Sequence, residues 1–180
     1  MASPQSFRTS YFDLWTPEEC AEIVGSMPER AWTPVDQHRE GTPFRSVELQ
    51  RPDFAGFPEL HERMLVGLES VNCALYRFDI DGVAEFDPPH AVRYQPGQGH
   101  YGWHMDSGEG HPLRKLSLVV LMNDAAEFEG GDLEIKGWGS QQLDQGRAIV
   151  FPSYFWHRVH PVTSGRRIVV VAWCQGPSFR

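Results

Sequence analysis

Apolar residues recur at helical spacing in two segments of the first part of the chain. The first segment follows Thr16, a candidate N-cap, with Pro17 at the first helical position and Glu19 three residues after the cap. This pattern forms a capping box and predicts a helix that runs to about Ser26. A second helix is predicted from about Pro58, where apolar side chains recur along one helical face: Leu60, Met64, Leu65, Leu68 and Val71.

The segment between these helices, Thr33–Phe57, is polar and rich in Pro, Arg and Asp, without a sustained period. It is interpreted as a long loop that contains one short strand at most. Long loops inside compact domains often serve as lids or binding loops, and a solvated connection is the alternative. Both interpretations stay open.

From Ala74 onward the pattern changes to short segments rich in β-branched and aromatic residues, separated by Gly, Pro, Asn and Asp. About eight strands without intervening helices predict a mostly β (α+β) fold, a jelly roll or barrel with helices packed on one sheet. The predicted strands are Ala74–Ile80, Ala84–Tyr94, Tyr101–Met105, Leu116–Met122, Asp132–Ile135, Arg147–Phe151, His157–Val162 and Ile168–Cys174.

Length and composition indicate one compact soluble domain. The chain has 180 residues, 41% hydrophobic and 22% charged, and no repeat or linker marks a boundary. We therefore expect a single domain over residues 1–180, with a helical part over about 1–73 and a β-core over about 74–175. The net charge of −8 disfavours nucleic acid as a partner. The sequence shows neither a membrane-spanning apolar run nor a signal-peptide pattern, so no membrane partner and a cytoplasmic location are expected.

A candidate metal site lies in the β-rich part. Residues two apart on a strand point to the same face, so His104 and Asp106 can present an imidazole and a carboxylate to one ion. His157, at the start of a later strand, is the candidate third ligand, and His160 is its competitor on the opposite strand face. Two histidines and one carboxylate on one side of a metal suit iron(II) in oxygenases, since the other positions stay open.

The open positions could take a 2-oxo acid, through its C1 carboxylate and ketone oxygen, and O₂. A dicarboxylic oxo acid would leave its far carboxylate in an apolar barrel, where an unpaired charge is costly. A buried arginine would compensate that charge in a bidentate pair. Strand alternation puts Arg167 on one face with Val169 and Val171, and Arg166 on the other. The choice between the two arginines stays open at this point.

An ordered series of motifs between Tyr94 and Gln175 resembles the prolyl 4-hydroxylase-like branch of the Fe(II)/2-oxoglutarate oxygenases. The motifs are Tyr94-x-x-Gly97, Tyr101, His104-x-Asp106, Leu118-x-x-Leu121-x-Asn123, Glu129-Gly130-Gly131-Asp132-Leu133, Phe151-Pro152-Ser153, His157-Arg158-Val159-x-Pro161-Val162-x-x-Gly165-x-Arg167 and Trp173-x-Gln175. The N-terminal third carries no motif of this family.

The resemblance implies the double-stranded β-helix form of the jelly roll. It also implies that the positions matching His104, Asp106 and His157 bind iron. The position matching Arg167 would bind the distal carboxylate of 2-oxoglutarate, with assistance from Tyr94. The implied cofactor and cosubstrates are Fe(II), 2-oxoglutarate and O₂, and ascorbate is a further candidate cofactor.

The expected function is therefore that of a dioxygenase that hydroxylates a C–H bond and releases succinate and CO₂. A protein or peptide residue such as proline is the first candidate substrate. A free amino acid or small natural product is the alternative, and a non-catalytic jelly-roll binding module is a third possibility. The first two differ in whether Thr33–Phe57 leaves an open groove or closes over a small pocket, and the sequence leaves the substrate, the stereochemistry and the oligomeric state open.

Overall fold

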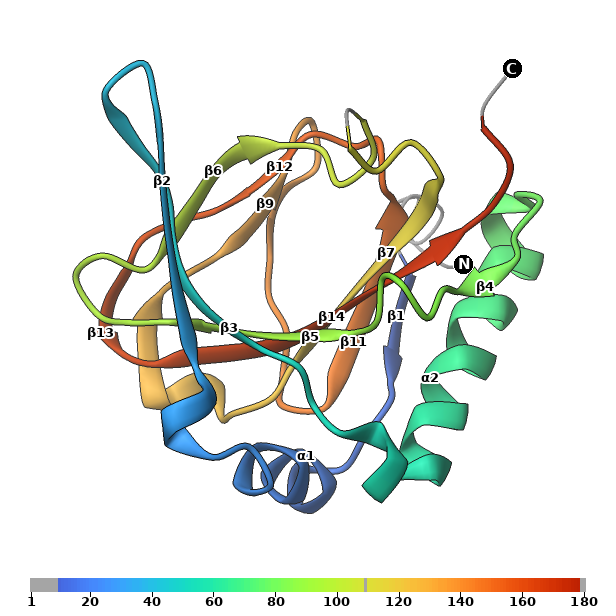
Figure 1. The fold of residues 1–180 in the computed structure, drawn as a ribbon, viewed down its shortest axis with the longest axis horizontal. Helices are drawn as coiled ribbons and strands as arrows, with labels where there is room; N and C mark the ends of the chain where they lie inside the picture. Colours follow the sequence, from blue (N-terminus) through green and yellow to red (C-terminus); the bar gives the residue numbers. More distant parts are fainter. Residues whose placement is uncertain (1–9, 109, 179–180) are drawn as a thin grey trace, which may run out of the picture.

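The computed structural model describes residues 10–108 and 110–178 (Figure 1). Its helices are α1 (Pro17–Gly25) and α2 (Pro58–Val71), with short turns η2 (Glu29–Ala31), η3 (Phe54–Gly56), η5 (Ala125–Glu127) and the π-helical η4 (Asn72–Tyr76). The strands are β1 (Ser10–Asp13), β2 (Thr33–Arg39), β3 (Thr42–Gln50), β4 (Gly82–Val83), β5 (His90–Tyr94), β6 (His100–His104), β7 (Arg114–Leu121), β8 (Phe128–Gly130), β9 (Leu133–Ile135), β10 (Gly139–Gln141), β11 (Arg147–Pro152), β12 (His157–Val159), β13 (Val162–Gly165) and β14 (Arg167–Gln175).

The strands form one curled antiparallel sheet that wraps around an interior (Figure 1). Its order is β1-β11-β7-β14-β5-β3-β6-β12-β9-β10, with β2 paired to β3 and β4 paired to β14. A separate two-stranded sheet joins β13 to β8. The predicted mostly β architecture is confirmed, and the curl brings β6 and β12 opposite β14 across the interior (Figure 1).

Alternation along the strands creates two apolar cores. On β14, Val169 and Val171 face the inside of the curl, whereas Val170 and Ala172 face outward. The outward side chains of β7, β11 and β14 pack against α1 and α2, as the helices beside the sheet in Figure 1 show. Leu118 on β7 is fully buried there, and burial of one leucine of this kind stabilises the fold by about 2 kcal/mol. The expectation of N-terminal helices on one sheet is confirmed.

Both predicted helices are present. Helix α1 begins with the predicted capping box: the Glu19 amide donates to Thr16 Oγ1 over 3.3 Å, and the Thr16 amide donates to Glu19 Oε2 over 2.8 Å. Helix α2 buries a stripe made of Leu60, Met64, Leu68 and Val71. The sheet therefore has a fixed helical backing.

The prediction of a loop at Thr33–Phe57 was wrong. Strands β2 and β3 form a long hairpin, and β3 continues into the main sheet by pairing with β5 and β6. The reason lies in β3, where Val47 and Leu49 face the interior core between more polar neighbours. The hairpin extends beyond the curled sheet (Figure 1). The described part of this N-terminal segment, residues 10–73, is thus not purely helical, because it holds β1, β2 and β3.

Two further strand predictions need correction. Ala74–Ile80 is not a strand, because a π-helical turn continues α2 and its apolar side chains pack on the outer core. The Asn72 side chain fixes the exit from this turn through bonds of 2.9 Å to the backbone amide and carbonyl of Phe78. Within Ala84–Tyr94, only His90–Tyr94 is strand.

Among the described residues no helix is long and apolar enough to cross a membrane.

Candidate active site

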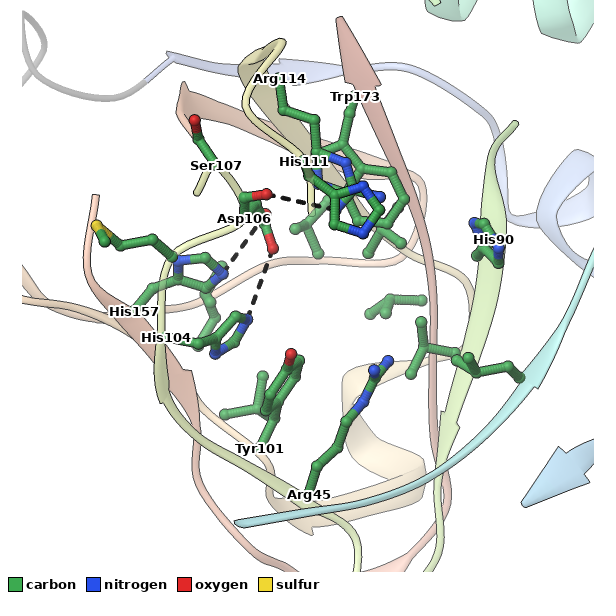
Figure 2. Close-up of a pocket in the computed structure, with 18 of the residues that line it drawn as sticks. Arg45, His90, Tyr101, His104, Asp106, Ser107, His111, Arg114, His157 and Trp173 are labelled. Atoms are coloured by element: carbon green, nitrogen blue, oxygen red, sulfur yellow. Dashed lines mark hydrogen bonds and ion pairs between the residues drawn. The ribbon is translucent and has the colours of Figure 1, made fainter. Parts of the chain in front are cut away.

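Three side chains from two neighbouring strands converge inside the curled sheet. His104 ends β6, Asp106 follows two residues later, and His157 begins β12 directly opposite His104 in the antiparallel pairing. One potential ligand atom from each residue lies within 4.8 Å of the others. Figure 2 shows both imidazoles turned toward the Asp106 carboxylate. The three predicted metal ligands are therefore brought together.

The backbone holds both imidazoles in one orientation. Nδ1 of His104 lies 2.8 Å from the carbonyl oxygen of Gly102, and Nδ1 of His157 lies 2.9 Å from that of Phe155. With the Nδ1 proton donated to these carbonyls, each Nε2 keeps its lone pair for a metal. Each Nε2 lies 3.6 Å from a different oxygen of Asp106. Such fixed tautomers are what a metal site requires.

The carboxylate of Asp106 is also held in place. The Ser117 hydroxyl donates to its Oδ2 over 2.6 Å and lies 2.9 Å from the hydroxyl of Ser153. The backbone amides of Asp106 and Ser107 both donate to the carbonyl of Ser153 over 2.9 Å. The turn after β6 is thereby fixed to the end of β11, so the carboxylate keeps its direction.

Burial and the charges of the neighbouring side chains set the protonation states of Asp106 and His157. Burial alone would raise the pKa of Asp106, but His157, His104 and the Ser117 hydroxyl more than offset it and hold that pKa well below its usual range. Burial lowers the pKa of His157 to about 4, although Asp106 opposes this shift. At neutral pH the site offers a carboxylate and a neutral imidazole, which are the ligating forms.

The donor set fits Fe(II). Two imidazole nitrogens and one carboxylate oxygen meet on one side, and beyond them lies a cavity of about 730 Å³. Apolar side chains cover much of its wall: Val92, Val119, Leu133, Val169 and Val171. Bound groups would therefore be shielded from bulk water.

The same cavity contains Arg167 and Tyr94, the two predicted cosubstrate residues. Arg167 is 4% exposed and its guanidinium carbon lies 5.3 Å from the centre of the Tyr94 ring. Its Nη1 is buried and has no hydrogen-bond partner among the described residues. An unpaired buried guanidinium nitrogen lowers the stability of the fold, so an anionic partner at this atom would be favourable. The distal carboxylate of an oxo acid held in the same cavity would fit that requirement.

Local backbone makes room for this arginine. Gly131 has φ +70°, and a Cβ there would lie 2.8 Å from Cδ of Arg167 and 2.9 Å from Cγ2 of Val162. Burial lowers the pKa of Arg167, but Tyr94 and Asp132 oppose the shift, and arginine stays charged at any working pH. Burial raises the pKa of Tyr94, so its hydroxyl stays protonated.

The alternative metal ligand, His160, and the alternative arginine, Arg166, both lie away from the cluster. His160 Nε2 contacts Glu134 Oε2 over 2.6 Å and is not part of the three-residue cluster. Arg166 is exposed and lines a different depression. Trp103, which precedes His104 on β6, does not line the cavity, and its ring centre lies 4.7 Å from the guanidinium carbon of Arg158.

Two residues around the site, Arg45 and Ser117, were not recognised from the sequence, whereas Tyr101 belongs to the series of motifs given above. Arg45 of β3 points into the cavity, with its guanidinium carbon 4.5 Å from the Tyr101 ring (Figure 2). Tyr101 stacks on His104 with 3.5 Å between ring centres. Ser117 could have been found, because it is the one polar residue in the apolar run 116–121 of β7, at an inward position. Arg45 could not, because its segment was interpreted as a loop.

Comparison with known proteins agrees with the fold. The chain superposes on a prolyl-4-hydroxylase from Pseudomonas putida with a TM-score of 0.68 and 20% identity, over 96% of this chain and 94% of the other. A prolyl hydroxylase from Trichoplax adhaerens, solved with a fragment of hypoxia inducible factor, gives a TM-score of 0.72 at 14% identity over 94% and 84% of the two chains. The jelly roll predicted above is confirmed.

Sequence relatives cover part of the chain. A PKHD-type hydroxylase from Psychrobacter is 43% identical over 49% of this chain and 38% of its own length. Another from Sphingopyxis alaskensis is 32% identical over 71% of this chain and 60% of its own length. The chain thus spans less than two thirds of the length of these two relatives.

Two histidines and a carboxylate converge inside this jelly roll, and the same cavity holds a buried arginine, an arrangement that suits iron-dependent oxygenases. Residues 89–175 match the model of the 2OG-Fe(II) oxygenase superfamily, so this part of the chain is similar to that superfamily. The match implies Fe(II), 2-oxoglutarate and O₂, as expected from the sequence.

Proposed function

We propose that this protein hydroxylates a residue of a peptide or protein substrate, with proline as the first candidate, in a reaction that consumes 2-oxoglutarate and O₂. The observation that carries the proposal is the pairing of the His104–Asp106–His157 cluster with the unpartnered Nη1 of Arg167 across one cavity. This arrangement has a place for a metal and a place for an anionic cosubstrate.

Each residue has a defined task in this proposal. His104, Asp106 and His157 would hold Fe(II), and Arg167 would bind the distal carboxylate of 2-oxoglutarate, with the Tyr94 hydroxyl as a second donor. When bound, Fe(II) and 2-oxoglutarate supply the oxidation of the substrate C–H bond by O₂, with succinate and CO₂ as coproducts. The apolar walls would exclude water and keep the substrate carbon as the nearest oxidisable group.

A peptide substrate has independent support. Phe86 and Met105 line the cavity and are 76% and 40% exposed, so the cavity reaches the surface beside apolar side chains. Exposed apolar groups at the rim of a site favour contact with a macromolecule. The Trichoplax prolyl hydroxylase was solved with a peptide, and the relatives are called PKHD-type hydroxylases.

The test is a succinate-release assay with Fe(II), ascorbate and 2-oxoglutarate, in which proline-containing peptides are compared with free amino acids. The proposal expects stimulation by peptides and a gain of one oxygen atom on the peptide by mass spectrometry. Stimulation by a free amino acid alone would favour the small-molecule alternative. Absence of any 2-oxoglutarate turnover or binding would favour a non-catalytic binding module.

A further inference from the structure

Buried polar atoms without partners concentrate in the active-site cavity. Among the described residues six buried side-chain atoms lack a hydrogen-bond partner, and four of them belong to residues that line this one cavity. They are Arg45 Nε, His90 Nδ1, Arg167 Nη1 and Trp173 Nε1. Buried polar groups are normally paired, and the Arg45, Arg167 and Trp173 nitrogens can only donate, so this cavity is built to receive hydrogen-bond acceptors. The proposed 2-oxoglutarate accounts for Arg167 only.

Arginines dominate the charge of the cavity in a protein whose net charge is −8. Arg39, Arg45 and Arg51 line it, and among the described residues none of them has a carboxylate within ion-pair distance. The cavity's own acidic groups are already engaged, because Asp87 pairs with Arg114 and Asp106 faces the two histidines. The three free arginines all come from the β2–β3 hairpin and its exit.

The charges expected in the loaded site leave Arg45 uncompensated. Fe(II), the Asp106 carboxylate, the 2-oxoglutarate dianion and the Arg167 guanidinium together carry no net charge. Arg45 then adds one positive charge in a place where its Nε is already shielded from solvent. Arg45 is half-buried, and a partly shielded charge of this kind would be stabilised by a second bound anion.

Arg45 also lies in the right position to orient a substrate. Its register partner across the β3–β6 pairing is Tyr101, and the guanidinium carbon lies 4.5 Å from that ring. Tyr101 in turn stacks on the metal-ligand candidate His104 at 3.5 Å. Arg45 is therefore one aromatic ring away from the metal cluster, and a group bound to it would hold its neighbouring carbons beside that cluster (Figure 2).

We propose that Arg45 binds a carboxylate of the substrate inside the cavity, while Arg39 and Arg51 attract that anion at the mouth, so that the enzyme selects acidic substrates. The inference rests on the proposed function and adds a substrate class to it. The carboxylate could be an acidic side chain next to the hydroxylated residue of a peptide, or the α-carboxylate of a free amino acid. Bidentate recognition by a planar guanidinium suits both.

The experiment compares matched substrates that differ in one charge. Proline peptides with Glu beside the proline are paired with the same peptides carrying Gln, and free L-proline is paired with L-prolinamide. Succinate release and oxygen incorporation are measured for each, and peptide affinity is measured by calorimetry on the iron- and 2-oxoglutarate-loaded protein without O₂. We expect the charged member of at least one pair to be preferred by about tenfold or more in kcat/KM and in affinity.

Variants assign that preference to Arg45. Arg45→Gln should remove the discrimination between charged and neutral partners, with the KM for 2-oxoglutarate changed less than twofold, and Arg45→Lys should restore part of it. Arg166→Gln, an exposed arginine away from the cavity, is the matched control and should keep the full preference.

Three results would overturn the inference. One is equal use of charged and neutral partners, and another is that no charged member stimulates turnover or binds. The third is an Arg45→Gln protein that keeps the preference but needs far more 2-oxoglutarate, which would assign Arg45 to the cosubstrate. A different result would contradict the proposed function itself: wild-type protein that neither binds nor turns over 2-oxoglutarate.

Discussion

The carboxylate of Asp87 and the guanidinium of Arg114 form a bidentate pair beside the turn that follows β6, with contacts of 2.6 and 2.7 Å. The pair joins the segment before β5 to the first residue of β7. The Arg114 guanidinium also lies 3.5 Å from the centre of the Trp173 ring, and Gln175 donates to the same carboxylate. Nη1 of Arg114 reaches the backbone carbonyl of Asp106 at 3.5 Å.

Asp87→Asn should lower the free energy of unfolding by about 3 kcal/mol, because it leaves the Arg114 charge buried without its partner. Burial would raise the pKa of Asp87, but Arg114 and Gln175 outweigh it and hold this pKa below its usual value of 3.8. A depressed pKa contributes stability above about pH 4 that is lost as the pH falls through the folded-state value. Urea unfolding of wild type and Asp87→Asn at pH 6 and at pH 3 measures the two free energies of unfolding.

The difference between wild type and Asp87→Asn should therefore shrink at the lower pH. A difference that stays constant between the two pH values would contradict the charge pairing as its cause.

His104→Ala or Asp106→Ala should abolish the substrate-independent conversion of 2-oxoglutarate to succinate, because two ligands hold Fe(II) too weakly. Iron content after loading, measured by elemental analysis, should fall in parallel. His160→Ala is the control: its imidazole contacts Glu134, so iron binding should be unchanged. Iron-loaded His104→Ala protein that retained turnover would show that the ligand assignment is wrong.

Arg167→Ala should raise the KM for 2-oxoglutarate by about a hundredfold or more, since a charged and bidentate interaction is lost inside an apolar cavity. Titration of 2-oxoglutarate in the succinate assay measures the change. Arg166→Ala, one residue away but exposed, should leave that KM unaltered. If Arg166→Ala had the larger effect, the roles of the two arginines would be exchanged.

Gly131→Ala should impair the cosubstrate pocket without removing any polar group. The new Cβ would press on Arg167 and Val162, at a backbone φ of +70° that side chains rarely adopt. We expect a higher KM for 2-oxoglutarate together with a lower melting temperature. Gly41→Ala is a useful comparison, because it also has positive φ but nothing within 4 Å of its Cβ. Equal effects of both substitutions on the KM would rule out a specific role for Gly131.

The sequence predicted those features that local patterns encode. Thr16 and Glu19 predicted the start of α1. The alternation of Arg167, Val169 and Val171 predicted that the arginine lies on the inner face of its strand. The ordered spacing of His104, Asp106 and His157 singled out the cluster, although only the register of β12 against β6 brings the two histidines opposite each other.

Other features depended on tertiary contacts that the sequence does not display. Strand β2 is exposed along nearly its whole length, so it lacks the apolar alternation by which strands are recognised. Leu75, Tyr76 and Phe78 have the composition of a strand, yet Leu75 and Tyr76 lie in a π-helical turn, and all three side chains pack on the outer core. The position of Arg45 beside Tyr101 follows only from the pairing of β3 with β6.

The β2–β3 hairpin lies outside residues 89–175, the part of the chain that matches the oxygenase superfamily. Its arginines would meet the substrate, whereas the metal and 2-oxoglutarate would be held entirely by later strands. Changes in the hairpin could thus alter which molecules are oxidised without disturbing the oxidation itself. Exchange of the β2–β3 hairpin between related proteins offers a route to new substrate selectivity with an unchanged metal and 2-oxoglutarate site.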